Sequence, residues 1–71
     1  MEQANKKVVE FIRDTWVIPF NNNNLFAKEH FIDEKTVRRI KEDDEYRISL
    51  ITIMRICEAK NLKLSEFFKM V

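Results

Sequence analysis

The sequence predicts a small all-α domain of five helices, and three observations support this. The 71 residues include no glycine and one proline, which argues against β-sandwiches, barrels and glycine-rich phosphate loops. Apolar side chains recur at steps of three and four residues, as they do along one side of a helix. Capping and turn residues divide that pattern into separate segments. Because a chain of this length holds one core, we expect residues 1–71 to form one compact domain.

The first helix is expected over residues 2–16, where charged residues separate the apolar positions Val8, Val9, Phe11, Ile12 and Trp16. Pro19 disfavours helical backbone at the residue before it, Ile18. The asparagines at 21–24 are typical turn and N-cap residues. We therefore predict a break between residues 17 and 22.

Two short helices joined by a tight turn are expected next. The first of them covers about residues 23–30, because Asp33 is a strong N-cap for a new helical pattern. The second covers about residues 34–41. It ends at the acidic run 42–45, whose negative charge opposes the C-terminal end of a helix dipole.

Two further helices complete the expected fold. Ser49 is the N-cap of a central packing helix that ends near residues 60–61. The apolar positions of this helix have core spacing and are Leu50, Ile53, Met54, Ile56, Cys57 and Ala59. Ser65 is expected to cap the last helix, which terminates at Val71 and contains Phe67, Phe68 and Met70.

Composition excludes several classes of function. Lysine and arginine number 13 and aspartate and glutamate 12, so a formal charge of +1 names no partner. A lone cysteine forms no intrachain disulfide, and no stretch resembles a membrane span or a signal peptide, so we expect a soluble cytoplasmic protein without a membrane partner. We find no Ser/His/acid arrangement, no paired carboxylates in an apolar setting and no nucleotide loop. We therefore predict a protein that is not an enzyme and that uses no cofactor, metal or small-molecule ligand.

Two reactive residue types are interpreted as structural. His30 has no second histidine with which to form a metal site. Cys57 lies on the core side of its helix, without a basic neighbour that would lower its pKa. Both side chains are expected to be buried and chemically inert.

The segment 23–42 carries the functional signal. A close crossing of two short helices needs a small side chain, and Ala27 supplies it. Apolar residues placed to bury one side of the helix pair are Phe26, Ile32, Val37 and Ile40. This spacing is typical of a helix-turn-helix.

The helix over 34–41 has two different faces at 100° per residue. Val37 and Ile40 lie on one side, and the opposite side carries Lys35, Arg38, Arg39 and Glu42. Arginine is the side chain best matched to the O6 and N7 atoms of guanine, so this face favours DNA binding. Exposed charges at such spacing also occur on ordinary solvated helices, which is the alternative interpretation.

At this point the sequence resembles a known family, the helix-turn-helix regulators of the Cro and phage-repressor class, also called the xenobiotic-response-element type. The resemblance covers about residues 22–68, in the blocks 26–27, 32–40, 49–53 and 62–67. It implies a five-helix domain whose third helix enters the DNA major groove while the second lies across the backbone. The expected partner is double-stranded DNA, and the expected function is transcriptional regulation.

The resemblance also implies a set of DNA-binding positions: Asn23, Asp33, Glu34, Lys35, Thr36, Arg38 and Arg39. Asn23 would contact a phosphate, Lys35 and Arg38 would face base edges, and Arg39 would reach a phosphate or a guanine. Glu34 would repel phosphates, so it either accepts a hydrogen bond from a cytosine amine or pairs with Arg38 and Lys35.

The chain departs from the family pattern in three places. The family usually has glycine in the interhelical turn, where this chain has Phe31, and glycine after the third helix, where it has Asp43. If either position needs a positive φ, a residue other than glycine costs on the order of 1 kcal/mol there. The segment 16–20 also looks longer than the first connection of the family.

A homodimer is expected, because one short helix covers few base pairs and two half-sites lie about 34 Å apart. We place the dimer contact at the C-terminal end, on Phe67, Phe68, Met70 and Val71. The alternative function is a protein-interaction module on the same fold, resembling an antitoxin or antirepressor and binding little or no DNA. The neutral net charge and the acidic run 42–45 favour that alternative, and its test is whether the acidic run points away from the basic face.

Overall fold

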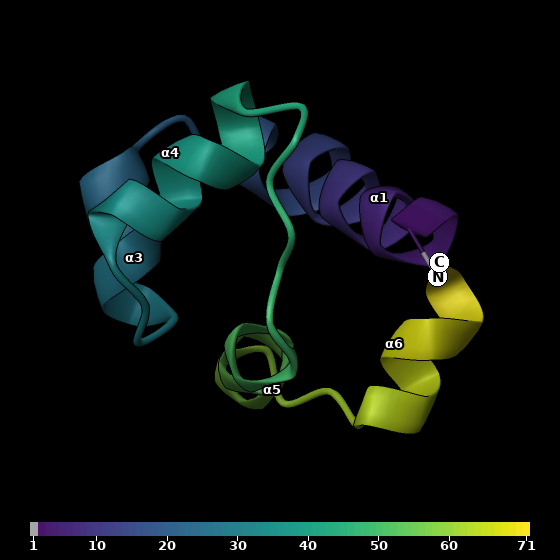
Figure 1. Cartoon of the computed structure of the whole chain (residues 1–71). Helices are drawn as coiled ribbons and strands as arrows, with labels where there is room; N and C mark the ends of the chain where they lie inside the picture. The colour runs from purple at the N-terminus through teal and green to yellow at the C-terminus, as the bar shows by residue number, and fades with distance from the viewer. Residues whose placement is uncertain (1) are drawn as a thin grey trace.

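The computed structural model describes residues 2–71, and all regular structure within them is helical (Figure 1). The elements in chain order are α1 (Glu2–Ile12), the π-helical turn η1 (Arg13–Val17), α2 (Ile18–Phe20), α3 (Asn23–Glu29), α4 (Glu34–Glu42), α5 (Leu50–Ala59) and α6 (Leu64–Met70). Because α1, η1 and α2 follow one another without interruption, the described residues form five helices. The predicted all-α, five-helix architecture is confirmed.

The predicted break lies within its expected interval, but it is confined to Asn21 and Asn22, because helical backbone continues to Phe20. Ile18 has helical backbone angles, φ −63° and ψ −47°, and its N–H bonds to the carbonyl of Arg13. Pro19 is the second residue of α2 and has no N–H to donate, and η1 shifts the hydrogen-bond register just before it. The helix ends at Asn21, whose φ of 57° is a left-handed conformation that asparagine tolerates.

Most of the predicted helix starts are confirmed. The side chain of Asn22 accepts a hydrogen bond from the N–H of Leu25 at 3.0 Å, and Ser49 does the same for Thr52 at 3.2 Å. Asp33 occupies the N-cap position of α4 with extended backbone, but its side chain makes no capping hydrogen bond in the described structure.

The start of α6 differs from the prediction. Its N-cap residue is Lys63, and the carboxylate of Glu66 accepts a hydrogen bond from the Lys63 N–H at 3.1 Å. Ser65 is therefore a residue of the first turn and not the cap. Glu66 stabilises this helix start in place of the serine hydroxyl.

The helices α3 and α4 pack directly on each other and are joined by the turn 30–33 (Figure 1). The predicted contact positions Phe26, Ala27, Val37 and Ile40 are all buried, and Ile32 is partly buried against them. The close crossing expected from Ala27 is thus present.

The helix α5 is less enclosed than predicted. Its inward side carries Ile53, Ile56 and Cys57, which are buried. The remaining predicted core positions, Leu50, Met54 and Ala59, are exposed. This helix packs on the core with one side only, because the amphipathic pattern gives it a single buried stripe.

The C-terminal helix α6 lies beside the first helix, and Phe67 anchors it. Phe67 is fully buried and packs against the rings of Phe11 and Trp16, with centroids 5.8 Å away in each case. The prediction that Phe67 lies in a dimer contact is therefore wrong, because packing in the core leaves none of its surface exposed. Phe68, Met70 and Val71 remain exposed.

Across residues 2–71, no helix combines the length and the apolar character needed to cross a bilayer.

Candidate nucleic-acid interface

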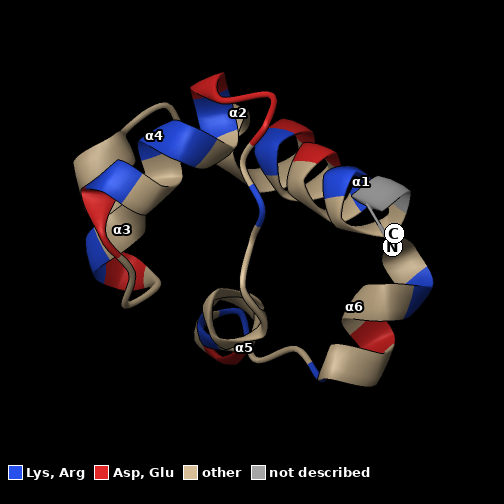
Figure 2. Ribbon diagram, viewed as in Figure 1, with Lys and Arg blue, Asp and Glu red and all other residues tan. Residues whose placement is uncertain are grey.

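The helix α4 separates apolar from cationic side chains, as its sequence pattern predicts. Val37 is 0% and Ile40 1% exposed, because both pack beneath the helix against α3 and α1. Lys35, Arg38 and Arg39 are exposed on the opposite side, and we call these three residues the basic face. Figure 2 shows these cationic positions along α4. The basic face is free to contact a large anionic partner.

Glu34 lies beside the basic face and pairs with one of its members. A carboxylate oxygen of Glu34 is 4.0 Å from a guanidinium nitrogen of Arg38, and the Arg38 side chain is 53% exposed. A solvated pair at this spacing contributes about 0.3–0.5 kcal/mol. This contact favours the interpretation in which Glu34 orients Arg38. Because the contact is weak, a phosphate or a base edge can displace Glu34 from Arg38.

The other DNA-contact positions implied by the resemblance have different surroundings. Asn23 is the first residue of α3 and is partly buried, and Asp33 is exposed at the start of α4. Thr36 is partly buried, and its side chain lies close enough to Tyr46, in the connection to α5, to lower the pKa of that phenol slightly. Burial raises the pKa of Tyr46, and nearby Arg39 acts in the opposite direction. Thr36 thus supports the fold beside the basic face.

The turn between α3 and α4 holds a bulky residue in a conformation that favours glycine. Phe31 has φ 58°, and its side chain is 70% exposed. An L-residue in this region costs on the order of 1 kcal/mol. By contrast, Asp43 has φ −101° and accepts a hydrogen bond from the Glu45 N–H at 2.9 Å, so the position after α4 requires no glycine.

Sequence reasoning missed one residue beside this turn. A guanidinium nitrogen of Arg55 donates to the carbonyl oxygen of Phe31 at 3.3 Å. The two residues are 24 positions apart in the chain, and no local pattern signals such a contact. Arg55 joins α5 to the turn that precedes the basic face.

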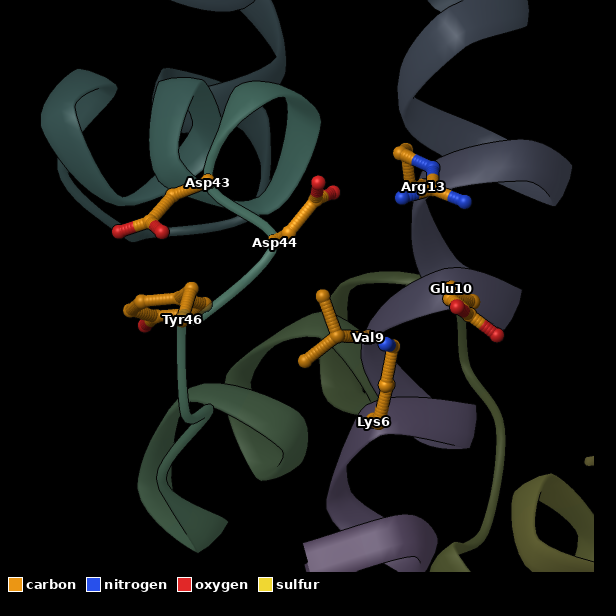
Figure 3. A pocket seen from close by; sticks show the side chains of 7 residues that line it. All are labelled: Lys6, Val9, Glu10, Arg13, Asp43, Asp44 and Tyr46. Atoms are coloured by element: carbon orange, nitrogen blue, oxygen red, sulfur yellow. The ribbon is translucent and has the colours of Figure 1, made fainter.

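The acidic run 42–45 lies at the far end of α4, next to the first helix (Figure 2). Asp43 and Asp44 help to line a shallow pocket whose other residues are Lys6, Val9, Glu10, Arg13 and Tyr46. The Asp44 carboxylate is directed toward Arg13 (Figure 3). Glu42 is different, because it is exposed and shares the outer side of α4 with Arg38. Asp44 therefore faces away from the basic face, while Glu42 reduces the positive charge at one end of it.

Arg13, on the first helix, is already paired on its other side. Its Nε lies 2.9 Å from a carboxylate oxygen of Asp14, and this hydrogen bond raises the pKa of Arg13 and lowers that of Asp14. The pocket of Figure 3 thus combines cations and carboxylates of similar number, and it offers no apolar cavity for a ligand.

His30 and Cys57 have the structural roles predicted for them. The His30 ring is buried, stacks on Phe26 with centroids 3.8 Å apart, and places Nδ1 2.7 Å from the Phe26 carbonyl oxygen. Burial lowers the pKa of His30 and raises that of the Cys57 thiol, so both groups favour their neutral forms. Over the described part of the chain, no group of three or more His, Cys, Asp or Glu side chains is placed to hold a metal ion.

Comparisons of this chain with protein-family models, with curated proteins and with solved structures found no match. The resemblance to the Cro and phage-repressor class therefore stays a prediction from the residues.

Proposed function

We propose that this protein is a sequence-specific double-stranded DNA-binding regulator that inserts α4 into the major groove. The observation that supports this is the basic face, which presents three cations on a helix whose apolar side is consumed by the core. A helix with its side chains is 10–12 Å wide, and the major groove is about 12 Å wide. The size and charge of α4 match that groove.

The residues of the proposed interface have separate roles. Arg38 and Lys35 read base edges, and the guanidinium of Arg38 can donate two parallel hydrogen bonds to a guanine. Arg39 neutralises a phosphate, and Asn23 at the start of α3 hydrogen-bonds the sugar–phosphate backbone. Recognition alone produces the regulatory effect, by occupying an operator.

The near-neutral net charge sets an expectation for affinity. With a formal charge of +1, attraction to DNA comes from the basic face and not from the protein as a whole. Few phosphates are neutralised, so log K is expected to fall with log salt with a shallow slope, close to −0.9 for each phosphate contact.

The primary experiment is selection of bound sequences from a random duplex pool, followed by titration of the selected operator. Arg38→Ala is expected to weaken operator binding by about 1–3 kcal/mol, because it removes a base contact. The matched control is Lys69→Ala, which removes one exposed cation from α6 and is expected to leave the affinity unchanged. Equal losses in the two variants, or no enriched sequence, would contradict sequence-specific binding through α4.

One observation favours a second candidate, a protein-interaction module. Glu42 carries negative charge on the outer side of α4, and exposed apolar side chains lie on other helices. A protein partner would tolerate such a mixed surface better than a polyanion does. Failure to bind any duplex at low salt would favour this candidate.

A further inference from the structure

The turn 30–33 between α3 and α4 depends on the backbone conformation of Phe31. With φ 58° at Phe31, the N–H of Ile32 reaches back to the carbonyl oxygen of Ala27 at 3.0 Å, as in a Schellman helix end. Glycine is the usual residue at this position, because a Cβ atom disfavours the left-handed region. The Phe31 ring is 70% exposed, so packing of the ring does little to hold this conformation.

Arg55, on α5, holds the same peptide unit from the outside. Its guanidinium donates to the Phe31 carbonyl oxygen at 3.3 Å, and the N–H of that peptide unit, on Ile32, is the group that bonds to Ala27. Phe31 cannot leave the left-handed region without rotating this peptide unit, because the oxygen and the N–H of a planar unit turn together. Both polar groups of one peptide plane are therefore held, one by α3 and one by α5.

The helix that carries Arg55 is firmly attached to the core. Ile53 and Ile56, which flank Arg55 in the chain, are 6% and 0% exposed. The hydroxyl of Ser49 caps the helix start by accepting a hydrogen bond from the N–H of Thr52 at 3.2 Å. Because α5 is fixed in this way, the Arg55 contact connects the turn 30–33 to the core of the protein.

The orientation of this peptide unit affects the recognition helix, because α4 begins directly after the turn. Asp33 is the N-cap of α4, and the basic face starts at Lys35. Val37 and Ile40 hold the middle of α4 on the core, so a rotation at Phe31 would displace mainly the N-terminal end of the helix. Hydrogen bonds to base edges need fixed donor positions, whereas phosphate contacts carry no sequence information. The conformation of the turn therefore bears on the reading of sequence more than on attraction to DNA.

We propose that Arg55 is a positioning residue for DNA recognition, which holds the Phe31 carbonyl and thereby fixes the N-terminal end of α4 against the duplex. This role rests on the proposed function, in which side chains of α4 read base edges. Arg55 itself does not touch the duplex. Its hydrogen bond is exposed to solvent, and the loss of one such bond corresponds to a change of about three- to tenfold in an equilibrium constant.

The first test compares Arg55→Met with Lys69→Met. Each variant exchanges one exposed cation for an apolar side chain of similar length, and the control lies on α6, across the molecule from the turn (Figure 1). We expect Arg55→Met to bind the selected operator about three- to tenfold more weakly than Lys69→Met does, and to bind random duplex equally well. Circular dichroism at the titration temperature corrects both affinities for unfolded protein. Equal operator affinities of the two variants would overturn the proposal.

The salt dependence of operator binding separates positioning from a direct contact. If Arg55 neutralised a phosphate, the slope of log K against log salt would be shallower by about 0.9 in Arg55→Met than in Lys69→Met. Positioning predicts the same slope in both variants, because the number of phosphate contacts does not change. A shallower slope in Arg55→Met alone would overturn the proposal and assign Arg55 to a contact with the DNA backbone.

A double substitution tests whether Arg55 acts through Phe31. Asparagine tolerates the left-handed conformation better than phenylalanine does, so the turn of Phe31→Asn depends less on the Arg55 contact. In that background, Arg55→Met is expected to weaken operator binding by at most about twofold. A loss as large as the one in the otherwise unmodified chain would show that Arg55 acts independently of the turn, and it would overturn the proposal.

Hydrogen exchange without DNA follows the turn directly and separates this role from the proposed function. The Ile32 amide is expected to exchange at least about threefold faster in Arg55→Met than in Lys69→Met, and the Ile56 amide equally fast in both. Unchanged exchange at Ile32 would overturn the proposal. Faster exchange at Ile32 in a chain that binds no duplex would reject the proposed function and with it the role of Arg55 in recognition. Operator binding that is the same in the two variants would reject the role of Arg55 and keep DNA binding.

Discussion

The helices α4 and α5 bury their inner sides in the same way and differ in what they expose. On α4 the side opposite Val37 and Ile40 is charged, whereas on α5 the side opposite Ile56 and Cys57 carries the exposed apolar residue Ile51 beside Arg55 and Glu58. Burial of one apolar stripe is enough to attach either helix to the core. The outer side is therefore free to vary, and on α4 its three cations are the basis of the proposed DNA contact.

The largest expected effect tests whether substitutions on the buried and on the exposed sides of these helices change the free energy of unfolding by different amounts. Ile40→Ala is expected to lower the free energy of unfolding by about 2–5 kcal/mol, because it leaves a cavity in the core. Ile51→Ala removes the same atoms from an exposed position and is expected to change it by less than about 0.5 kcal/mol. Urea denaturation of the two variants measures both values. Similar losses would show that Ile51 is buried in solution by contacts within the chain.

A smaller effect is expected at the turn that touches both helices. Phe31→Asn is expected to raise the free energy of unfolding by about 1 kcal/mol, because asparagine tolerates a positive φ better than phenylalanine does. The increase is to be measured by urea denaturation at low protein concentration. A decrease would show that the Phe31 ring is packed within the monomer.

The smallest effect is a pH dependence confined to the α3–α4 pair. Burial holds the pKa of His30 below its usual value of 6.5, so the unfolded chain binds more protons than the folded one as the pH falls through that value. The contribution of neutral His30 to stability is complete above pH 6.5 and decreases as the pH falls toward the lower pKa of the folded state. Unfolding of His30→Phe, which keeps a ring beside Phe26, is expected to lack this decrease between about pH 7 and 5. Identical pH profiles in the two proteins would exclude His30 as the source.

Features that depend on neighbouring residues were predictable from the sequence. Asn22 and Ser49 each precede an apolar period and bond the N–H three residues on, so both caps were visible locally. The family resemblance marked positions 31 and 43 as ones where glycine is usual, and of these two only Phe31 has a positive φ. The inward placement of Val37 and Ile40 follows directly from helical periodicity.

Features that depend on distant residues were not predictable. A proline argues for a break, and only the π-helical turn before Pro19 explains why the first helix continues. Periodicity predicted core positions for both Leu50 and Phe67, yet Phe67 packs on Trp16 and is buried, whereas Leu50 is 58% exposed. For the same reason the role of Arg55 in the candidate site had no local signal.

The side chain of Asn5 meets the backbone of Ile48 through two hydrogen bonds, each 3.1 Å long, one donated by the amide and one accepted by it. These two hydrogen bonds hold the connection between α4 and α5 at Ile48, so that most of its residues precede the point of attachment. Residues inserted before Ile48 would lengthen the connection as a closed loop, and the position of α5 would stay unchanged. Residues inserted after Ile48 would instead displace Ser49 from its N-cap position. We therefore expect the tolerance of this connection to insertions to change abruptly at the peptide bond between Ile48 and Ser49.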